Sequence, residues 1–242
     1  MFLKALEEHS YRIRKFWKVR SYAPFTFHNA AVLQGDSRSR SDLISLGLTA
    51  GSIDVVVSSP PYATALPYID TDRLSILLLD GMTSRARRPV EEQLVGSREI
   101  RTAERRSLEA LIDHDIGAAS LPSQVKIFIS HVRERMLDGE VGFRRANMPS
   151  LLLRYFRDMQ CVLENASWTL SNEGKAYIVM GDNKTSDGHG DIFIPTGDLV
   201  AAIAGEVGLK LVDTIPITVT TENRVHIRHA IKENKVLCFQ KK

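Results

Sequence analysis

The order of apolar and polar positions predicts alternating strands and helices over much of the chain. Residues 30–34 and residues 52–57 form short apolar runs that are typical of buried strands. A stretch with helical spacing over residues 41–46 separates the two runs. The second run is rich in β-branched residues and has no polar alternation, which favours an inner strand of a parallel sheet.

The last third of the chain returns to the same alternation. The predicted elements there are a helix over residues 149–168, a turn at 172–174, a strand over 175–180, a helix over 195–207 and strands over 209–213 and 235–240. Strands and helices that alternate with short connections imply an α/β fold with a mostly parallel sheet.

Three segments differ in composition, and they define the expected domain organisation. Residues 1–28 form a basic and aromatic helical segment, and residues 71–148 form a helical, arginine-rich insertion. Residues 29–70 and 149–242 contain the alternating strands and helices, so we expect them to form one α/β unit that the insertion interrupts.

Basic side chains in the first segment are candidates for contacts with nucleic acid. Residues 11–20 carry five basic side chains and no acid, interleaved with aromatic residues. Arg12, Arg14, Lys15 and Lys18 could therefore contact phosphates while the aromatic rings stack on bases. The alternative is an amphipathic helix that packs its apolar side inward and leaves the charges solvated.

The insertion offers a second basic surface, in which Arg85 and Arg88 are the candidate nucleic-acid contacts. Acidic residues accompany these arginines, so a solvated helical face is the alternative to a nucleic-acid groove. The formal net charge of +3 does not decide between the two, because the distribution of charge matters more than its total.

Cysteine and histidine usage and hydropathy indicate which further classes of site to expect. Cys161 and Cys238 both lie in apolar stretches, so we expect core residues in a reducing compartment and no disulfide. The longest apolar stretches are too short to span a membrane, and residues 1–20 contain no apolar signal region, so we expect a cytoplasmic protein. His226 and His229 have no further ligands nearby, so we expect no metal site.

A tetrapeptide suited to chemistry follows the strand predicted over residues 52–57. Ser59-Pro60-Pro61-Tyr62 stands at the carboxyl end of that strand, where open α/β sheets place their ligands. Two consecutive prolines fix the backbone and remove two amide donors, which leaves carbonyl oxygens to face a substrate amine. Tyr62 can offer an aromatic face to a planar base, and Ser59 adds a hydroxyl group. The alternative is a Pro-Pro turn that caps the strand, with Tyr62 packed in the core.

These residues resemble the fourth motif of the N4-cytosine and N6-adenine DNA amino-methyltransferases, and the serine form is most similar to the N4-cytosine branch. Residues 33–37 resemble the third motif of the family, whose acidic residue lies near the adenine of the cofactor. The resemblance implies S-adenosyl-L-methionine as the cofactor, with Gly35, Asp36 and Ser58 as cofactor-binding residues. It also implies a partial Rossmann-like class I methyltransferase fold, from its third strand onward, with a helical insertion.

The resemblance further implies a reaction and a substrate. The four residues of the tetrapeptide would form the catalytic site for direct transfer of a methyl group to an exocyclic amine of DNA, with N4 of cytosine favoured. A base inside a duplex cannot reach such a pocket, so we expect it to flip out and stack on Tyr62. A site-specific methyltransferase of this kind fits a role in restriction and modification.

One departure from the family changes the expected assembly. Residues 1–242 contain no Phe-x-Gly-x-Gly loop to hold the methionine part of the cofactor, and the pattern Gly188-His189-Gly190 is typical of a flexible turn. A sheet without the first strands would expose an apolar edge and face. We therefore expect a split enzyme, in which a second subunit, or a second copy in a homo-oligomer, completes the site. The alternatives are a non-catalytic nucleic-acid-binding or scaffolding relative and an RNA amino-methyltransferase.

Overall fold

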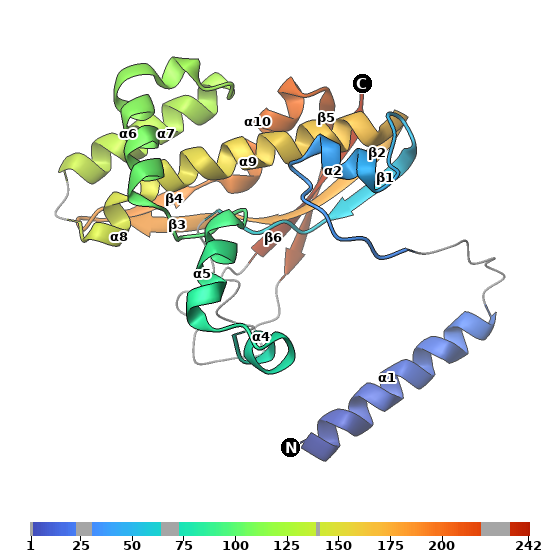
Figure 1. Ribbon diagram of the computed structural model, residues 1–242. Coiled ribbons are helices and arrows are strands. Elements are labelled where there is room, and N and C mark those ends of the chain that lie inside the picture. The colour runs from blue at the N-terminus through green and yellow to red at the C-terminus, as the bar shows by residue number, and fades with distance from the viewer. Residues whose placement is uncertain (1, 23–30, 64–72, 139–140, 219–232) are drawn as a thin grey trace. The chain divides into compact units, whose positions relative to one another are not determined.

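The chain divides into two units, which are described separately. The computed structural model describes residues 2–22, 31–63, 73–138, 141–218 and 233–242 (Figure 1). The first unit is Met1–Gln34 and the second is Gly35–Lys242, so the division falls after residue 34, whereas the sequence suggested residue 28.

The first unit is built on one amphipathic helix, α1 (Phe2–Tyr22). Ile13, Phe16 and Trp17 lie on one side of α1, because residues three and four apart share a helix face. These three side chains are 48%, 60% and 55% exposed within the structure, and the two aromatic rings make an edge contact. The expected helix is confirmed.

The second unit contains a four-stranded sheet in the order β1 (Ile53–Ser58), β2 (Leu170–Gly181), β6 (Glu233–Lys241) and β5 (Leu209–Thr218). β1 pairs with β2 in parallel, whereas β6 is antiparallel to both of its neighbours. Three of these strands therefore run in one direction, as a mostly parallel sheet requires. Two of the three pairings are nevertheless antiparallel, because the reversed β6 lies between β2 and β5.

Helices flank this sheet, and a hairpin extends from it (Figure 1). The helices are α2 (Arg40–Ser45), α4 (Arg73–Asp80), α5 (Ser84–Gln93), α6 (Thr102–Asp115), the 3₁₀ turn η1 (Ile116–Ala118), α7 (Ser123–Asp138), α8 (Phe143–Ala146), α9 (Met148–Thr169) and α10 (Thr196–Glu206). The hairpin consists of β3 (Asn183–Ser186) and β4 (Asp191–Ile194). The elements from α4 to α8 lie in the stretch predicted to be a helical insertion, residues 71–148.

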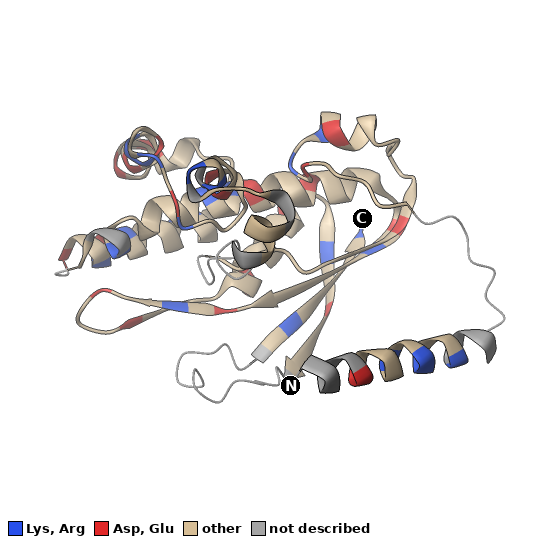
Figure 2. Ribbon diagram, turned by 60° about the horizontal axis from the view of Figure 1, so that its bottom comes forward, with Lys and Arg blue, Asp and Glu red and all other residues tan. Residues whose placement is uncertain are grey.

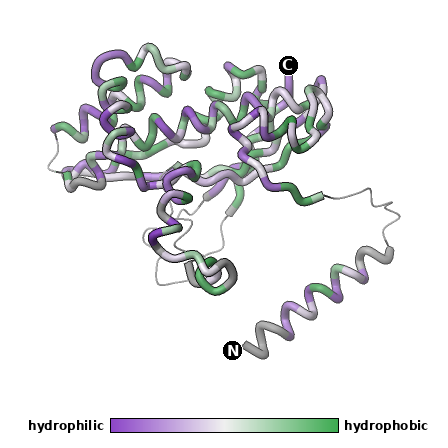
Figure 3. The backbone as a smooth tube through the Cα atoms, viewed as in Figure 1, coloured by the Kyte–Doolittle hydropathy of each residue, from purple (hydrophilic) through white to green (hydrophobic). Residues whose placement is uncertain are grey.

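The long helix α9 organises the core. Its apolar residues recur at helical spacing, and Pro149 stands in its first turn, where a proline costs no hydrogen bond (Figure 3). α6, α7 and α10 all pack against α9, and α10 also contacts β2, β5 and β6. Phe156 on α9 and Phe239 on β6 are both fully buried in the resulting core.

The first predicted strand, over residues 30–34, is wrong for the residues that the structure describes. Residues 31–34 form no strand, and Val32 and Leu33 are 102% and 59% exposed. The prediction of β1 as an inner strand is also wrong, because β1 ends the sheet and the described residues pair with one side of it only. Whether a strand is paired on one side or on both depends on the other strands of the sheet. An apolar run in the sequence does not indicate which strands will lie beside it.

Local departures from the predictions lie in β2, in the hairpin and on α9. The turn expected at 172–174 is an irregular part of β2, where Glu173 has a positive φ of 63° and the register with β1 shifts. The β3–β4 hairpin was not predicted. Cys161 is exposed on α9, contrary to prediction, whereas Cys238 is buried as expected.

The remaining predictions concern membranes and metals. Among the described residues, no helix combines the length and the hydropathy that crossing a membrane requires. His226 and His229 lie outside the described residues.

Candidate active site

The loop Ser59–Ala63, called the diproline loop here, continues directly from the end of β1 at Ser58. Ser59 is exposed, the next three residues are half-buried and Ala63 is fully buried. The loop is thus anchored at its far end and open to solvent at its near end.

Two hydrogen bonds hold backbone oxygens of the diproline loop. The phenol of Tyr155, a buried residue of α9, donates to the Pro61 carbonyl at 3.1 Å. The amide of Asn183, at the start of β3, donates to the Ala63 carbonyl at 2.8 Å. Tyr155 thus already occupies one acceptor position of the Pro61 carbonyl. Within the described residues, the Pro60 carbonyl receives no hydrogen bond, and Pro60 itself is half-buried.

The side chains of Ser59 and Tyr62 lie next to each other. Burial raises the pKa of the Tyr62 phenol above its ordinary value, and a hydrogen bond with Ser59 acts in the opposite direction. The phenol is therefore protonated at neutral pH. The two hydroxyl groups together form a polar patch at the exposed end of the loop.

The insertion also reaches the diproline loop, through the segment Gln93–Glu99, which we call the brace. Gly96 in the brace is buried and has a positive φ of 75°. A Cβ atom at Gly96 would lie 3.1 Å from the Tyr62 carbonyl oxygen and 3.2 Å from the Pro61 Cβ. Only glycine accommodates both the backbone conformation and this contact. The sequence analysis missed Gly96, because a lone glycine between helices has many explanations.

Asp36, the predicted cofactor contact, is tied to a neighbouring arginine. Its carboxylate accepts hydrogen bonds from the Arg38 backbone at 2.9 Å and from the Arg38 guanidinium at 2.8 to 3.1 Å. The hydrogen bond from the Arg38 side chain is the main cause that lowers the pKa of Asp36. The carboxylate is therefore ionised, and Arg38 occupies much of its hydrogen-bonding capacity.

Arg38 connects the predicted cofactor residues to the brace. Its guanidinium donates to the Gln93 carbonyl at 2.9 Å and forms an ion pair with Asp158 at 3.2 Å. Burial raises the pKa of Asp158, and the positive charge of Arg38 opposes that effect. Arg38 thus connects Asp36 to the start of the brace, and Gly96 in the brace contacts the diproline loop.

Gly35 and Ser58, the other two residues predicted to bind the cofactor, lie against the end of α2 and at the end of β1, respectively. A Cβ atom at Gly35 would lie 2.7 Å from the Leu46 Cδ1 atom, so Gly35 packs closely against the leucine side chain at the end of α2. Ser58 is the last residue of β1 and is half-buried. Gly35 and Asp36, two of the residues predicted to bind the cofactor, thus make close contacts within the chain.

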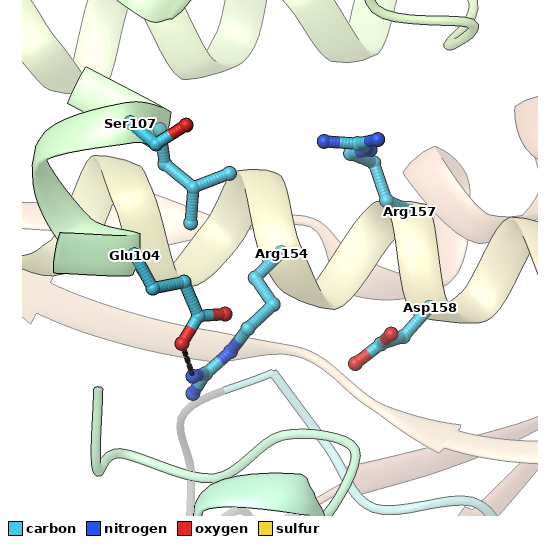
Figure 4. A pocket seen from close by; sticks show the side chains of 6 residues that line it. Glu104, Ser107, Arg154, Arg157 and Asp158 are labelled. Atoms are coloured by element: carbon cyan, nitrogen blue, oxygen red, sulfur yellow. Dashed lines mark hydrogen bonds and ion pairs between the residues drawn. The ribbon is translucent and has the colours of Figure 1, made fainter. Parts of the chain in front are cut away.

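A cavity of about 280 Å³ lies between α6 and α9 (Figure 4). Its lining residues are Glu104, Ser107, Leu108, Arg154, Arg157 and Asp158. Arg154 forms an ion pair with Glu104 at 3.4 Å, whereas Arg157 is exposed. Neither the diproline loop nor the brace lines this cavity, although Arg154 also donates hydrogen bonds to carbonyls of the brace.

The predicted nucleic-acid contacts lie on two helices (Figure 2). Arg12, Arg14, Lys15 and Lys18 are exposed on α1, where Arg12 pairs with Glu8 at 2.7 Å. Arg85 is exposed on α5, and the side chain of Arg88 lies outside the described residues. The four basic residues of α1 belong to the first unit, whereas Arg85 and the diproline loop belong to the second.

Comparison with known proteins gives matches to solved structures alone. No family model matches the chain, and no curated protein is significantly similar to it. Three crystal structures of a candidate DNA modification methylase from Thermus thermophilus are similar, with sequence identities of 12%, 14% and 13% and TM-scores of 0.38, 0.38 and 0.39. The third of these is a complex with S-adenosyl-L-methionine. Each match covers 86% of this chain and 50%, 52% and 53% of the other, so the chain spans about half the length of these structures.

Proposed function

We propose that this chain is the catalytic-motif subunit of an S-adenosyl-L-methionine-dependent enzyme that methylates an exocyclic amino group of a DNA base, with N4 of cytosine as the favoured target. The observation that carries the proposal is the diproline loop at the end of β1. Its Ser59 side chain is exposed, and its Pro60 carbonyl receives no hydrogen bond within the described residues. The likeness of Ser59-Pro60-Pro61-Tyr62 to the fourth motif of the amino-methyltransferases supports the same assignment.

The loop offers hydrogen-bond acceptors of the kind that an amine requires. The Ser59 hydroxyl and the Pro60 carbonyl accept the two amine hydrogens, which favours a tetrahedral nitrogen and directs its lone pair toward the methyl donor. S-adenosyl-L-methionine supplies the activated methyl group when it is bound. Tyr62 stacks on the extruded base, and extrusion costs a few kcal/mol.

A second subunit completes the cofactor site in this proposal. Arg38 already occupies the Asp36 carboxylate, and Gly35 packs against Leu46, so the described residues do not hold the whole cofactor by themselves. One edge of β1 is unpaired among the described residues, and its Val55 and Val57 side chains are 50% and 73% exposed on the adjoining sheet face. Such a subunit would cover this edge and face. A second copy of this chain is the other candidate for that place.

Methylation by the assembled complex tests the assignment. The chain is expressed with neighbouring reading frames that encode a Phe-x-Gly-x-Gly loop, and nucleosides from treated duplex DNA and RNA are analysed by mass spectrometry. We expect N4-methylcytosine in DNA and a loss of about a hundredfold or more in rate for Ser59→Ala. Ser75→Ala, an exposed serine on α4, is the matched control and keeps the wild-type rate. A wild-type rate in Ser59→Ala rejects the assignment. Methylation found only in RNA would mean that the substrate is RNA and not DNA.

A non-catalytic scaffold is the second candidate, and the engaged state of Asp36 favours it. Calorimetry with S-adenosyl-L-methionine separates the two, because a scaffold gives no heat of binding with or without the second subunit. The enzyme gives heat in the assembled complex.

A further inference from the structure

We propose that the brace, Gln93–Glu99, positions the diproline loop and that Gly96 is the positioning residue. This inference rests on the proposed function, because it names a determinant of the same site. It gives the insertion a direct part in shaping the loop, in addition to any contact with DNA or a partner.

The contact between the brace and the loop is close enough to fix the backbone of the loop. A Cβ atom at Gly96 would lie 3.1 Å from the Tyr62 carbonyl oxygen, which is tighter than ordinary van der Waals contact. The peptide at Gly96 therefore rests directly on the Pro61–Tyr62 backbone. Tyr155 on α9 and Asn183 on β3 hold the loop by hydrogen bonds, and the brace is the third element that contacts it.

Two arginines fix the brace to the rest of the second unit. The Arg154 guanidinium donates to the Ser97 carbonyl at 2.7 Å and to the Glu99 carbonyl at 2.9 Å. The Arg38 guanidinium donates to the Gln93 carbonyl at 2.9 Å. Hydrogen bonds from a charged donor to backbone oxygens are stronger than neutral ones, so both ends of the brace are firmly held.

The position of the brace in the chain couples the diproline loop to the helices of the insertion. The brace begins at the last residue of α5 and ends shortly before α6, so it connects these two helices of the insertion. A displacement of these helices moves Gly96, and the tight contact passes the movement to the Pro60–Tyr62 backbone. The orientation of the Pro60 carbonyl and of the Tyr62 ring thus depends on the insertion.

A comparison of substitutions at Gly96 and at Gly81 separates the effect of the contact with the loop from the effect of backbone strain. Gly81 has a similar positive φ, 62° against 75°, but no atom lies within 4 Å of the place that a Cβ would take. Gly96→Ala and Gly81→Ala thus share the strain and differ in the contact. We expect amide hydrogen exchange of the peptide 57–63 to accelerate about tenfold or more in Gly96→Ala and to stay unchanged in Gly81→Ala. Equal exchange in the two variants overturns the proposal.

A second pair of variants covers the case in which Gly96→Ala does not fold. Arg154→Met removes the hydrogen bonds to the brace and keeps an apolar stem, whereas Arg157→Met removes an exposed arginine one turn further along α9. We expect faster exchange of the peptide 57–63 in Arg154→Met alone. The same exchange in both variants overturns the proposal.

Kinetics in the assembled complex give an independent measurement. Arg154→Met is expected to lower kcat about tenfold with little change in KM, because the loop is misaligned while substrate contacts remain. An unchanged kcat overturns the proposal. If the wild-type complex methylates no substrate, the proposed function fails, and the exchange experiments still decide whether the brace holds the loop.

Discussion

The two faces of the sheet differ sharply, although the same strands form both. On the face toward α9 and α10, the paired residues Ala176 and Phe239 are fully buried. On the opposite face, Val57 is paired with Tyr177 and is 73% exposed. Ile215 on β5 is 47% exposed on that same face, because its pairing with Val236 places it there.

This difference separates a sheet face that is covered from one that is exposed among the described residues. Helices of the same chain cover the first face. The opposite face carries β-branched residues of the kind that strands use for packing, but the described residues leave them open to solvent. The contrast supports the proposed need for a second subunit at this surface.

The largest effect is expected on the covered face. Phe239→Ala removes a fully buried ring from the core, so we expect the free energy of unfolding to fall by about 3 to 5 kcal/mol. Urea denaturation followed by circular dichroism measures the change. A fall below about 1 kcal/mol would mean that this face is less tightly packed than its burial indicates.

The hydrogen bond between α9 and the diproline loop gives the next largest effect. Tyr155→Phe leaves the Pro61 carbonyl without its donor, and we expect a loss of about 1 to 3 kcal/mol in unfolding free energy. Tyr177→Phe, a half-buried tyrosine on the opposite face of the sheet, is the matched control and should change little. The comparison fails if the two variants are equally stable.

An acid-sensitive contact ties the hairpin to the insertion. The backbone N–H of Gly190 donates to Asp187, and this bond, together with that from His189 and the ion pair with Arg135, lowers the pKa of Asp187 to about 2. A carboxyl group with a lowered folded-state pKa stabilises the fold above its unfolded pKa of about 4, and the effect is lost as the pH falls toward 2.

We therefore expect the wild type to lose stability between pH about 4 and 2 more steeply than Asp187→Asn does. Denaturation midpoints measured across this range provide the test. Parallel pH profiles for the two proteins would show that Asp187 contributes nothing to the acid dependence.

The smallest effect is expected on the open face. Val57→Ser in the isolated chain should change the free energy of unfolding by no more than about 0.5 kcal/mol, because the side chain is already largely in water. The same urea titration measures it. A loss comparable to that of Phe239→Ala would show that Val57 is covered in solution, and the contrast between the faces would disappear.

Much of the secondary structure follows from periodicity. The helical spacing of residues 149–168 predicts α9 closely, and the β-branched run at residues 52–57 predicts β1 within one residue. Both signals arise from neighbours along the chain, which a sequence displays directly. The hairpin β3–β4 was missed because its two strands are only four residues each and contain several polar residues.

In the candidate site, too, some features follow from the local sequence and others depend on the packing of distant residues. The sequence by itself determined the diproline loop and its place after a strand, because proline fixes its own backbone whatever surrounds it. The tertiary structure alone decided that Tyr155 occupies the Pro61 carbonyl, that Arg38 occupies Asp36 and that Gly96 supports the loop. These contacts join residues far apart in the chain, so they depend on how the helices and strands pack rather than on any local pattern. For the same reason, only the fold shows that β1 ends the sheet among the described residues.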